Sequence, residues 1–180
     1  MGAKITIDSA SMMNKGFEMI EAKWLFGVTP EQIQVVVHPQ SVIHSMVQFE
    51  DGAVIAQLGI PNMKLPISYA FSYPKRLHSK APRLDFTQYA TLTFEEPDME
   101  RFRNLAFAFD AVRRGGNMPC ILNAANEVVV AAFLSDKIGF LQMSDVIEKT
   151  MAKASFIPVP TYEDYVATDA EARRIAAGLF

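Results

Sequence analysis

The chain has 180 residues, half of them hydrophobic, and a formal net charge of −3. This mildly acidic balance gives no reason to expect a nucleic-acid partner, and no apolar run reaches the roughly 18 residues of a membrane span. The single cysteine, Cys120, excludes an internal disulfide and a cysteine-only metal cluster, which together with the lack of a visible targeting segment predicts a cytoplasmic protein.

Mixed α and β structure is predicted for the first third of the chain. The alternating, β-rich stretch KITI, residues 4–7, predicts a strand. An apolar stripe at helical spacing then predicts a helix over residues 11–26 that stops before Gly27. We expect the members of this stripe in the core: Met13, Phe17, Ile20 and Trp24.

Further strands are predicted beyond this helix. The unbroken apolar run IQVVV, residues 33–37, is typical of a strand buried on both faces. Residues 42–58 contain two apolar segments around Glu50–Gly52, a turn sequence that predicts a β-hairpin. On the first strand of this hairpin, Ile43, Val47 and Phe49 are expected to share a face with the small Ser45.

The rest of the chain divides into a connector and helices. Residues 73–98 contain prolines and cationic side chains with little periodicity, which predicts a linker. Four amphipathic helices with short joints are predicted over residues 99–114, 119–134, 143–154 and 161–179. Ser144 is positioned as the cap of the third helix. We therefore predict an α+β fold, in which a partial mixed or antiparallel sheet with flanking helices precedes a C-terminal four-helix bundle.

Polar side chains gather on one face of the first predicted helix. At about 100° per residue, four of them share one side of its first two turns: Ser11, Asn14, Lys15 and Glu18. Ser9 lies beside the helix start, where free backbone N–H groups and the helix dipole favour an anion. The arrangement predicts a phosphate site, and the Glu18 carboxylate is a ligand type that hard divalent metals prefer.

An ordinary solvated surface is the alternative interpretation of this face. Lys15 and Glu18 can form an i,i+3 ion pair on a wet helix. Gly16 costs about 1 kcal/mol relative to alanine inside a helix, which is easier to explain where a ligand or another backbone comes close. Apolar residues flank the polar face, and this is more typical of a pocket wall than of an open surface.

Three stretches of the sequence resemble a single enzyme family. They are KITIDSASMMNKGFEMIEAKWLFG, HPQSVIHSMVQFEDGAVIAQLG and LNAANEVVVAAFL, in that order. All three are similar to 1-deoxy-D-xylulose 5-phosphate reductoisomerase, and the run DSASMMNKG, with Glu18 following, is specific to that family. The resemblance extends from the N-terminus to near the C-terminus.

The resemblance implies an oxidoreductase and isomerase of the non-mevalonate pathway of isoprene biosynthesis. Such an enzyme rearranges 1-deoxy-D-xylulose 5-phosphate, a sugar phosphate, and reduces the product with NADPH to 2-C-methyl-D-erythritol 4-phosphate, assisted by a divalent metal (Mn, Mg or Co). By the same resemblance, Ser9 and Asn14 hold the phosphate, and Lys15 stabilises charge on substrate oxygens. Glu18 binds both substrate and metal and is, with Lys15, catalytic, while Gly2 contacts NADPH.

Other parts of that family's enzyme are missing from the sequence. There is no Gly-rich nucleotide-binding turn, and Met1-Gly2 resembles the end of the active-site loop, so the family's remaining metal ligands lie upstream. We therefore expect a C-terminal fragment that is inactive in isolation. Residues 1–72 are expected to be the C-terminal half of the catalytic and dimerisation domain, 73–98 a linker, and 99–180 the helical bundle domain.

The family also implies a homodimer, with the 42–58 hairpin as a candidate pairing edge. A non-catalytic dimerisation or assembly module is therefore the competing function. A plastid location would replace the cytoplasmic one in a plant or apicomplexan host.

Several further residues have a structural interpretation. His38 and His44 lack a partnering carboxylate motif and are interpreted as turn and core residues, with His44 able to support the site indirectly. We expect burial for Cys120. Three polar residues are expected to cap or cross-link the helical bundle: Asn123, Asn126 and Glu127.

Overall fold

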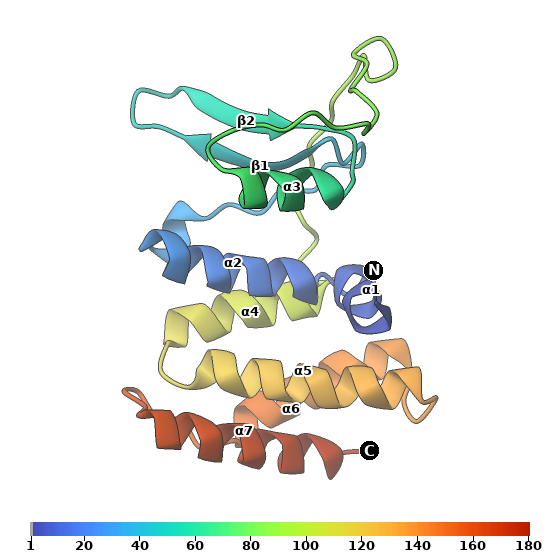
Figure 1. The fold of residues 1–180 in the computed structure, drawn as a ribbon. Coiled ribbons are helices and arrows are strands. Elements are labelled where there is room, and N and C mark those ends of the chain that lie inside the picture. Colours follow the sequence, from blue (N-terminus) through green and yellow to red (C-terminus); the bar gives the residue numbers. More distant parts are fainter. Residues whose placement is uncertain (1) are drawn as a thin grey trace. The chain divides into compact units, whose positions relative to one another are not determined.

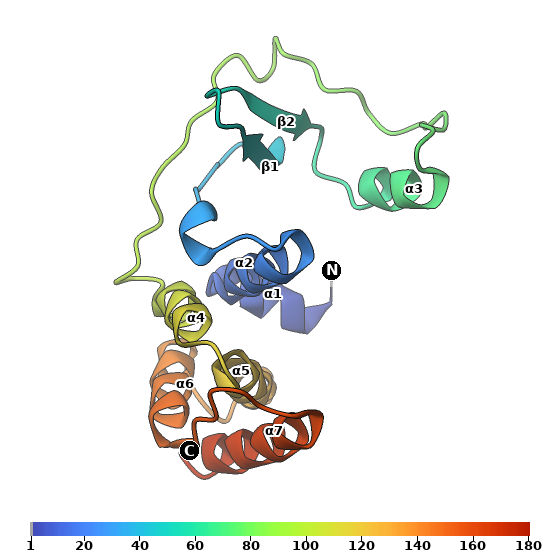
Figure 2. The ribbon, with the colours of Figure 1, turned by 90° about the vertical axis from the view of Figure 1, so that its left-hand side faces the viewer.

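The computed structural model describes residues 2–180, which form two compact units (Figures 1 and 2). The first unit joins the N-terminal residues through Val35 to the segment Pro97–Phe180, and the second is Val36–Glu96. Met1, which the resemblance places at the end of an active-site loop, lies outside the described residues. The predicted division at residues 1–72, 73–98 and 99–180 refers to domains of a longer enzyme and stays a prediction.

The first unit is built from six α-helices, one of which is central (Figure 1). They are α1 (Ala3–Ala10), α2 (Met13–Phe26), α4 (Arg103–Arg114), α5 (Met118–Leu134), α6 (Phe140–Lys153) and α7 (Tyr162–Ala177), with a short 3₁₀ turn at Pro30–Gln32. Helix α5 contacts α1, α4, α6 and α7, while α2 packs on α4. Because α5 is apolar on nearly all sides, neighbouring helices must cover it all around. Helices α4, α6 and α7 do so and form the predicted four-helix bundle with α5, and α1 adds a further contact.

Local sequence explains the starts of α5 and α7. Pro119 occupies the first turn of α5, where its missing N–H costs nothing. At α7, the Thr161 hydroxyl accepts a hydrogen bond from the Asp164 backbone N–H (3.2 Å), and the Asp164 carboxylate accepts one from the Thr161 N–H (2.8 Å). The predicted cap at Ser144 is wrong, because α6 begins at Phe140 and the Ser144 hydroxyl instead donates to Asn104 of α4 (2.9 Å).

The joint between α4 and α5 is fastened to the segment between α6 and α7. Asn117 is fully buried, and its side-chain amide donates to the Ser155 carbonyl and to the Thr168 hydroxyl, both at 2.9 Å. Its side-chain oxygen accepts a hydrogen bond from the Ile157 N–H (2.9 Å). Gly116 lies directly beneath the same segment with a φ of +55°. The chain crosses so closely here that a side chain at Gly116 has no room.

Residues 4–7 are helical, so the predicted strand there is wrong. They belong to α1, in which Lys4 and Asp8 form an i,i+4 ion pair (2.8 Å). Ile7 packs against the core of the first unit, and Asp8 is buried. Tertiary contacts on one side of a short helix have therefore overridden the β preference of Ile5, Thr6 and Ile7.

The helical stripe is confirmed except at its end. Helix α2 stops before Gly27, and Met13 is fully buried, while Phe17 and Ile20 pack against the core. Trp24, however, is 71% exposed and lies beside the Lys23 ammonium (4.5 Å to the ring centroid), so its predicted burial is wrong. The buried residues of α2 are Met13, Gly16 and Met19, so the buried face is centred on Gly16, about 60° around the helix from Met13. Trp24 lies on the far side of Met13 from this centre and therefore faces solvent.

The second unit contains the predicted hairpin. Strands β1 (Ile43–Gln48) and β2 (Val54–Leu58) pair antiparallel, and the turn between them places Gly52 at a φ of +85°. His44 is an extra residue in β1, between the pairs Ile43–Leu58 and Ser45–Gln57. The prediction that Ile43 and Val47 share a face assumed strict alternation of side chains along the strand. The β-bulge at His44 interrupts that alternation between the two residues.

A short helix and an extended return segment complete the second unit. Helix α3 (Lys64–Ser72) follows the hairpin, and the chain then runs back to the start of the unit without regular structure. There, the His38 ring donates a hydrogen bond from Nδ1 to the Thr93 carbonyl (2.8 Å) and stacks on Phe94. Within residues 33–37, only Val37 pairs, in a single bridge with Glu95, so the predicted buried strand is not formed.

Candidate functional site

A sharp turn between α1 and α2 positions the residues that the sequence singles out. Met12 has a left-handed conformation (φ +58°), and the Met12 N–H donates to the Ser9 carbonyl (3.2 Å). Ser11 ends α1 and is buried, with its hydroxyl bonded to the Asp8 carbonyl, so it does not share the polar face of α2 as predicted. Helix α2 therefore begins at Met13, two residues later than expected, without a capping side chain.

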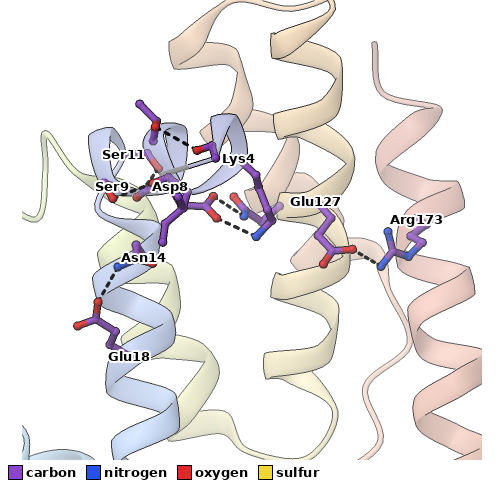
Figure 3. A network of polar contacts seen from close by, with 12 residues as sticks. Lys4, Asp8, Ser9, Ser11, Asn14, Glu18, Glu127 and Arg173 are labelled. Carbon is purple, nitrogen blue, oxygen red and sulfur yellow. Dashed lines mark hydrogen bonds and ion pairs between the residues drawn. The ribbon is translucent and has the colours of Figure 1, made fainter. Parts of the chain in front are cut away.

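We call Ser9, Asn14, Lys15 and Glu18 the polar cluster. Within it, the Asn14 amide donates to one Glu18 carboxylate oxygen (2.6 Å; Figure 3). The Lys15 ammonium forms an ion pair with the other oxygen. The side chains of Lys15 and Glu18 are 38% and 46% exposed. These three side chains thus lie together at the surface of the first unit, as the shared helical face predicted.

Ser9 and Gly2 lie on α1 rather than on α2. The Ser9 side chain is exposed, and its hydroxyl donates to the Ile5 carbonyl of its own helix (2.7 Å). Gly2 is the N-cap of α1, and its carbonyl accepts hydrogen bonds from the backbone and side chain of Thr6. Ser9 therefore precedes the tight turn, and its hydroxyl would have to leave the Ile5 carbonyl to donate to an anion at the start of α2, so the predicted phosphate site stays a prediction.

The residues of the polar cluster do not make a divalent metal site by themselves. Among residues 2–180, no three side chains of the ligating types His, Cys, Asp and Glu come together. Glu18 offers one carboxylate, and in this structure both of its oxygens are engaged by Asn14 and Lys15. Hard divalent cations take six or more oxygen ligands, so Glu18 can contribute only one part of such a site.

Two cavities lie in the second unit. One of about 330 Å³ is lined by Gln57, Leu65, Pro66, Tyr69, Ala70 and Arg76. A smaller one of about 210 Å³ lies between the end of β2 and residues 81–84. Neither is lined by a residue of the polar cluster, whose Lys15 and Glu18 side chains are partly exposed on the first unit.

Sequence reasoning missed a buried carboxylate next to the polar cluster. Asp8 is 3% exposed, and its two oxygens accept hydrogen bonds from Asn126 of α5 (2.8 Å) and from Lys4 (2.8 Å). Figure 3 shows Asp8 directed from α1 toward α5, whereas Ser9 and Glu18 lie away from that contact. The i,i+4 spacing of Lys4 and Asp8 could have indicated an ion pair on a helix. Because residues 4–7 were predicted as a strand, this spacing was not interpreted as helical.

Polar residues of α5 cross-link the first unit, as predicted for Asn126 and Glu127. Asn126 reaches Asp8 of α1, while the Glu127 carboxylate pairs with Arg173 of α7 (2.5 Å). Hydrogen bonds to Asp169 and Glu127 raise the pKa of the Arg173 guanidinium further above its ordinary value. Burial raises the pKa of the Cys120 thiol, so this cysteine is a poorer nucleophile than a free one.

Gly16 is explained by helix packing rather than by a ligand. A Cβ built on Gly16 would lie 2.5 Å from the Ala108 Cβ of α4, far inside contact distance. The glycine therefore lets α2 and α4 approach closely, and this contact fixes the helix that carries Asn14, Lys15 and Glu18.

Replacing Gly16 with alanine should destabilise the chain despite the better helix propensity of alanine. We expect a loss of about 1–3 kcal/mol in the free energy of unfolding, because overpacking outweighs the gain of about 1 kcal/mol in helix propensity. Urea denaturation of the 180-residue chain measures it. The double variant Gly16→Ala/Ala108→Gly restores the space and should be more stable than the sum of the single changes predicts; strict additivity would show that the contact is not tight.

Two family models match this chain. One, described as the DXP reductoisomerase C-terminal domain, covers residues 58–175. The other, described as the 1-deoxy-D-xylulose 5-phosphate reductoisomerase C-terminal domain, covers residues 1–26. Together with the fold, these matches define the C-terminal region of a reductoisomerase.

Known proteins agree with the family models. The 1-deoxy-D-xylulose 5-phosphate reductoisomerase of Bacteroides thetaiotaomicron is 78% identical over 99% of this chain, which corresponds to 46% of the relative. The solved enzyme of Zymomonas mobilis, in complex with NADPH, is 49% identical with a TM-score of 0.90, and the match covers 98% of this chain and 47% of that one. A DOX-P reductoisomerase in complex with NADPH, fosmidomycin and magnesium is 41% identical with a TM-score of 0.89, over 99% of this chain and 46% of that one.

The chain belongs to the 1-deoxy-D-xylulose 5-phosphate reductoisomerase family. It spans about half the length of the relatives it matches, and the match to C-terminal domain models confirms the expected region. The predicted α+β fold is also confirmed. No helix within residues 2–180 combines the length and the apolar character that crossing a bilayer demands.

Proposed function

We propose that this chain is the C-terminal part of an enzyme that converts 1-deoxy-D-xylulose 5-phosphate to 2-C-methyl-D-erythritol 4-phosphate. The conversion is an isomerisation followed by reduction with NADPH, in the non-mevalonate route to isoprenoids. The observation that carries the proposal is the polar cluster beside the uncapped start of α2, in a chain of this family. A cytoplasmic location is proposed with it; the two relatives whose organisms are named are bacterial, and they do not support the plastid alternative.

The polar cluster has the chemistry to hold the phosphate end of such a substrate. The Ser9 hydroxyl, the Asn14 amide and the N–H groups of the first turn of α2 are hydrogen-bond donors, and the Lys15 ammonium supplies charge. Asn14 and Lys15 are bonded to Glu18 in this structure, so substrate binding requires them to turn from the carboxylate toward the substrate. Lys15 would then stabilise negative charge that develops on the substrate oxygens.

Binding of NADPH and of a divalent metal requires more protein groups than Gly2 and Glu18 provide. Gly2 is exposed at the start of α1 and offers its backbone to NADPH. A divalent metal, which is magnesium in one of the solved relatives, would supply Lewis acidity, and Glu18 would give it one carboxylate ligand. Since the chain matches about half of its relatives, we propose that the isolated 180 residues are inactive.

The proposed partner is a second copy of the chain, paired through the hairpin. Several apolar side chains of the hairpin are between 42% and 64% exposed: Met46, Val47, Phe49, Val54 and Ile55. Such a surface on an open two-stranded sheet favours association. The same observation favours the competing function, in which residues 2–180 act only as a dimerisation or assembly module.

A chimeric enzyme tests the proposed function. In it, this chain replaces the matching part of the Bacteroides thetaiotaomicron relative, and the relative itself is the control. We expect the chimera to oxidise NADPH when supplied with 1-deoxy-D-xylulose 5-phosphate and magnesium, to elute as a dimer, and the isolated chain to show no turnover. A folded chimera without activity would favour the assembly module, and turnover by the isolated chain would contradict its proposed inactivity.

A further inference from the structure

The first unit contains an almost fully buried carboxylate whose side chain makes no hydrogen bond to the polar cluster. Asp8 is 3% exposed, and its partner Asn126 on α5 is 1% exposed. Burying a carboxylate costs free energy unless its oxygens are hydrogen-bonded, and here each oxygen has one donor, at 2.8 Å in both cases. A bare apolar contact between α1 and α5 would avoid this cost, so the polar contact provides orientation as well as attachment.

The Asp8 contacts join three helices at the turn that bears the polar cluster. Asn126 holds Asp8 to α5, and the Lys4 ammonium, bonded to Asp8, lies 5.4 Å from the centroid of the Phe17 ring on α2. The Asp8 backbone carbonyl also accepts the Ser11 hydroxyl at the end of α1. Ser9 is the neighbour of Asp8 in sequence, so a rotation of α1 about its axis moves the Ser9 hydroxyl directly.

A second and independent anchor fixes the other half of the polar cluster. Helix α2 is set by the close contact of Gly16 with Ala108 of α4, and it carries Asn14, Lys15 and Glu18. The spacing between the Ser9 hydroxyl and these side chains therefore depends on how α1 is held. Only the Asp8 side chain provides a directed, buried polar contact from α1 to α5 among the described residues.

We propose that Asp8 is a positioning residue, which sets the Ser9 hydroxyl relative to the start of α2 through Asn126 and Lys4. The inference rests on the proposed function, because it assumes that the polar cluster binds the substrate phosphate. Asp8 itself touches no substrate. Its loss should weaken substrate binding more than it slows the chemical steps, since Ser9 would be displaced while Lys15 and Glu18 stay in place.

The test uses the chimeric enzyme with the variant Asp8→Asn. We expect the KM for 1-deoxy-D-xylulose 5-phosphate to rise about tenfold while kcat changes by less than about threefold. The swap Asp8→Asn/Asn126→Asp re-forms an amide–carboxylate hydrogen bond and should return the KM to within about threefold of the unchanged chimera. If Asp8→Asn does not fold, Asn126→Ala, which removes the α1–α5 hydrogen bond and keeps the Lys4–Asp8 pair, takes its place with the same expected rise in KM.

Glu127→Gln is the matched control, because it weakens the neighbouring polar contact from α5 to α7 on the other side of the same helix. Its KM should equal that of the unchanged chimera. An unaltered KM in Asp8→Asn, an equal rise in Glu127→Gln, or a swap that restores nothing would each overturn the positioning role. An unchanged chimera without activity would instead refute the proposed function, so the two failures are distinguishable.

Discussion

Gly116→Ala should unfold the first unit or bring it close to unfolding. A Cβ at this position would lie 2.2 Å from the Ile157 carbonyl oxygen and 3.0 Å from the Pro158 Cα, and both are backbone atoms that cannot rotate away. The φ of +55° adds about 1–2 kcal/mol for a residue with a side chain. The segment after α6 must therefore move, which also breaks the hydrogen bonds of Asn117 with Ile157.

We expect a total loss of more than about 3 kcal/mol, a large part of the 5–15 kcal/mol typical of a domain. Urea denaturation of the 180-residue chain, followed by circular dichroism, measures this loss. Gly27→Ala is the matched control, since Gly27 has a similar φ of +65° but nothing within 4 Å of its Cβ position. It should lose only the conformational cost of about 1–2 kcal/mol. Equal losses at the two glycines would show that the close crossing at Ile157 does not matter.

Glu18→Gln should nearly abolish turnover of the chimeric enzyme. The change removes the proposed metal-ligand charge and keeps the size of the side chain, so the fold should be unaffected at a position that is 46% exposed. We expect kcat/KM to fall about a hundredfold or more, and the magnesium concentration for half-maximal rate to rise. Magnesium titration of NADPH oxidation measures both quantities.

Ser9→Ala is the informative comparison for Glu18→Gln. Because Ser9 is proposed to hold the phosphate only, its loss should raise the KM for the sugar phosphate and leave the magnesium requirement unchanged. Both side chains belong to the polar cluster, and both changes remove one polar group without adding volume. Small and equal effects of the two variants would mean that the polar cluster is a solvated surface, as the alternative interpretation held.

The sequence predicted the parts of the fold that rest on local patterns. The bundle helices, the stop of α2 at Gly27 and the hairpin around Glu50–Gly52 all follow from periodicity and turn chemistry, and the structure confirms them. Errors arose where distant contacts decide. Residues 4–7 have the local pattern of a strand. The structure makes them helical, and the Asp8–Asn126 hydrogen bond that holds this helix joins residues more than a hundred positions apart, so no local pattern could reveal it.

The polar cluster was only partly predictable for the same reason. Helical spacing placed Asn14, Lys15 and Glu18 together, and the structure brings them within hydrogen-bonding distance. The left-handed turn at Met12 was not visible in the pattern, and it removes Ser11 from the face. Gly16 signalled a close approach correctly, but only the structure identifies α4 as the neighbour. Roles in binding and catalysis stay predictions until the variants are measured.

The first unit is discontinuous in sequence, and this has a consequence for biosynthesis. Helices α1 and α2 are translated before the second unit, yet α4, on which α2 packs, and α5, on which α1 packs, are translated after it. At general synthesis rates of about 5–20 residues per second, the nascent apolar face of α2 waits on the order of 5–20 s for its partners. The intervening hairpin can fold during that interval, so the chain should acquire its native contacts from the middle outward, and α2 is the segment most in need of a chaperone.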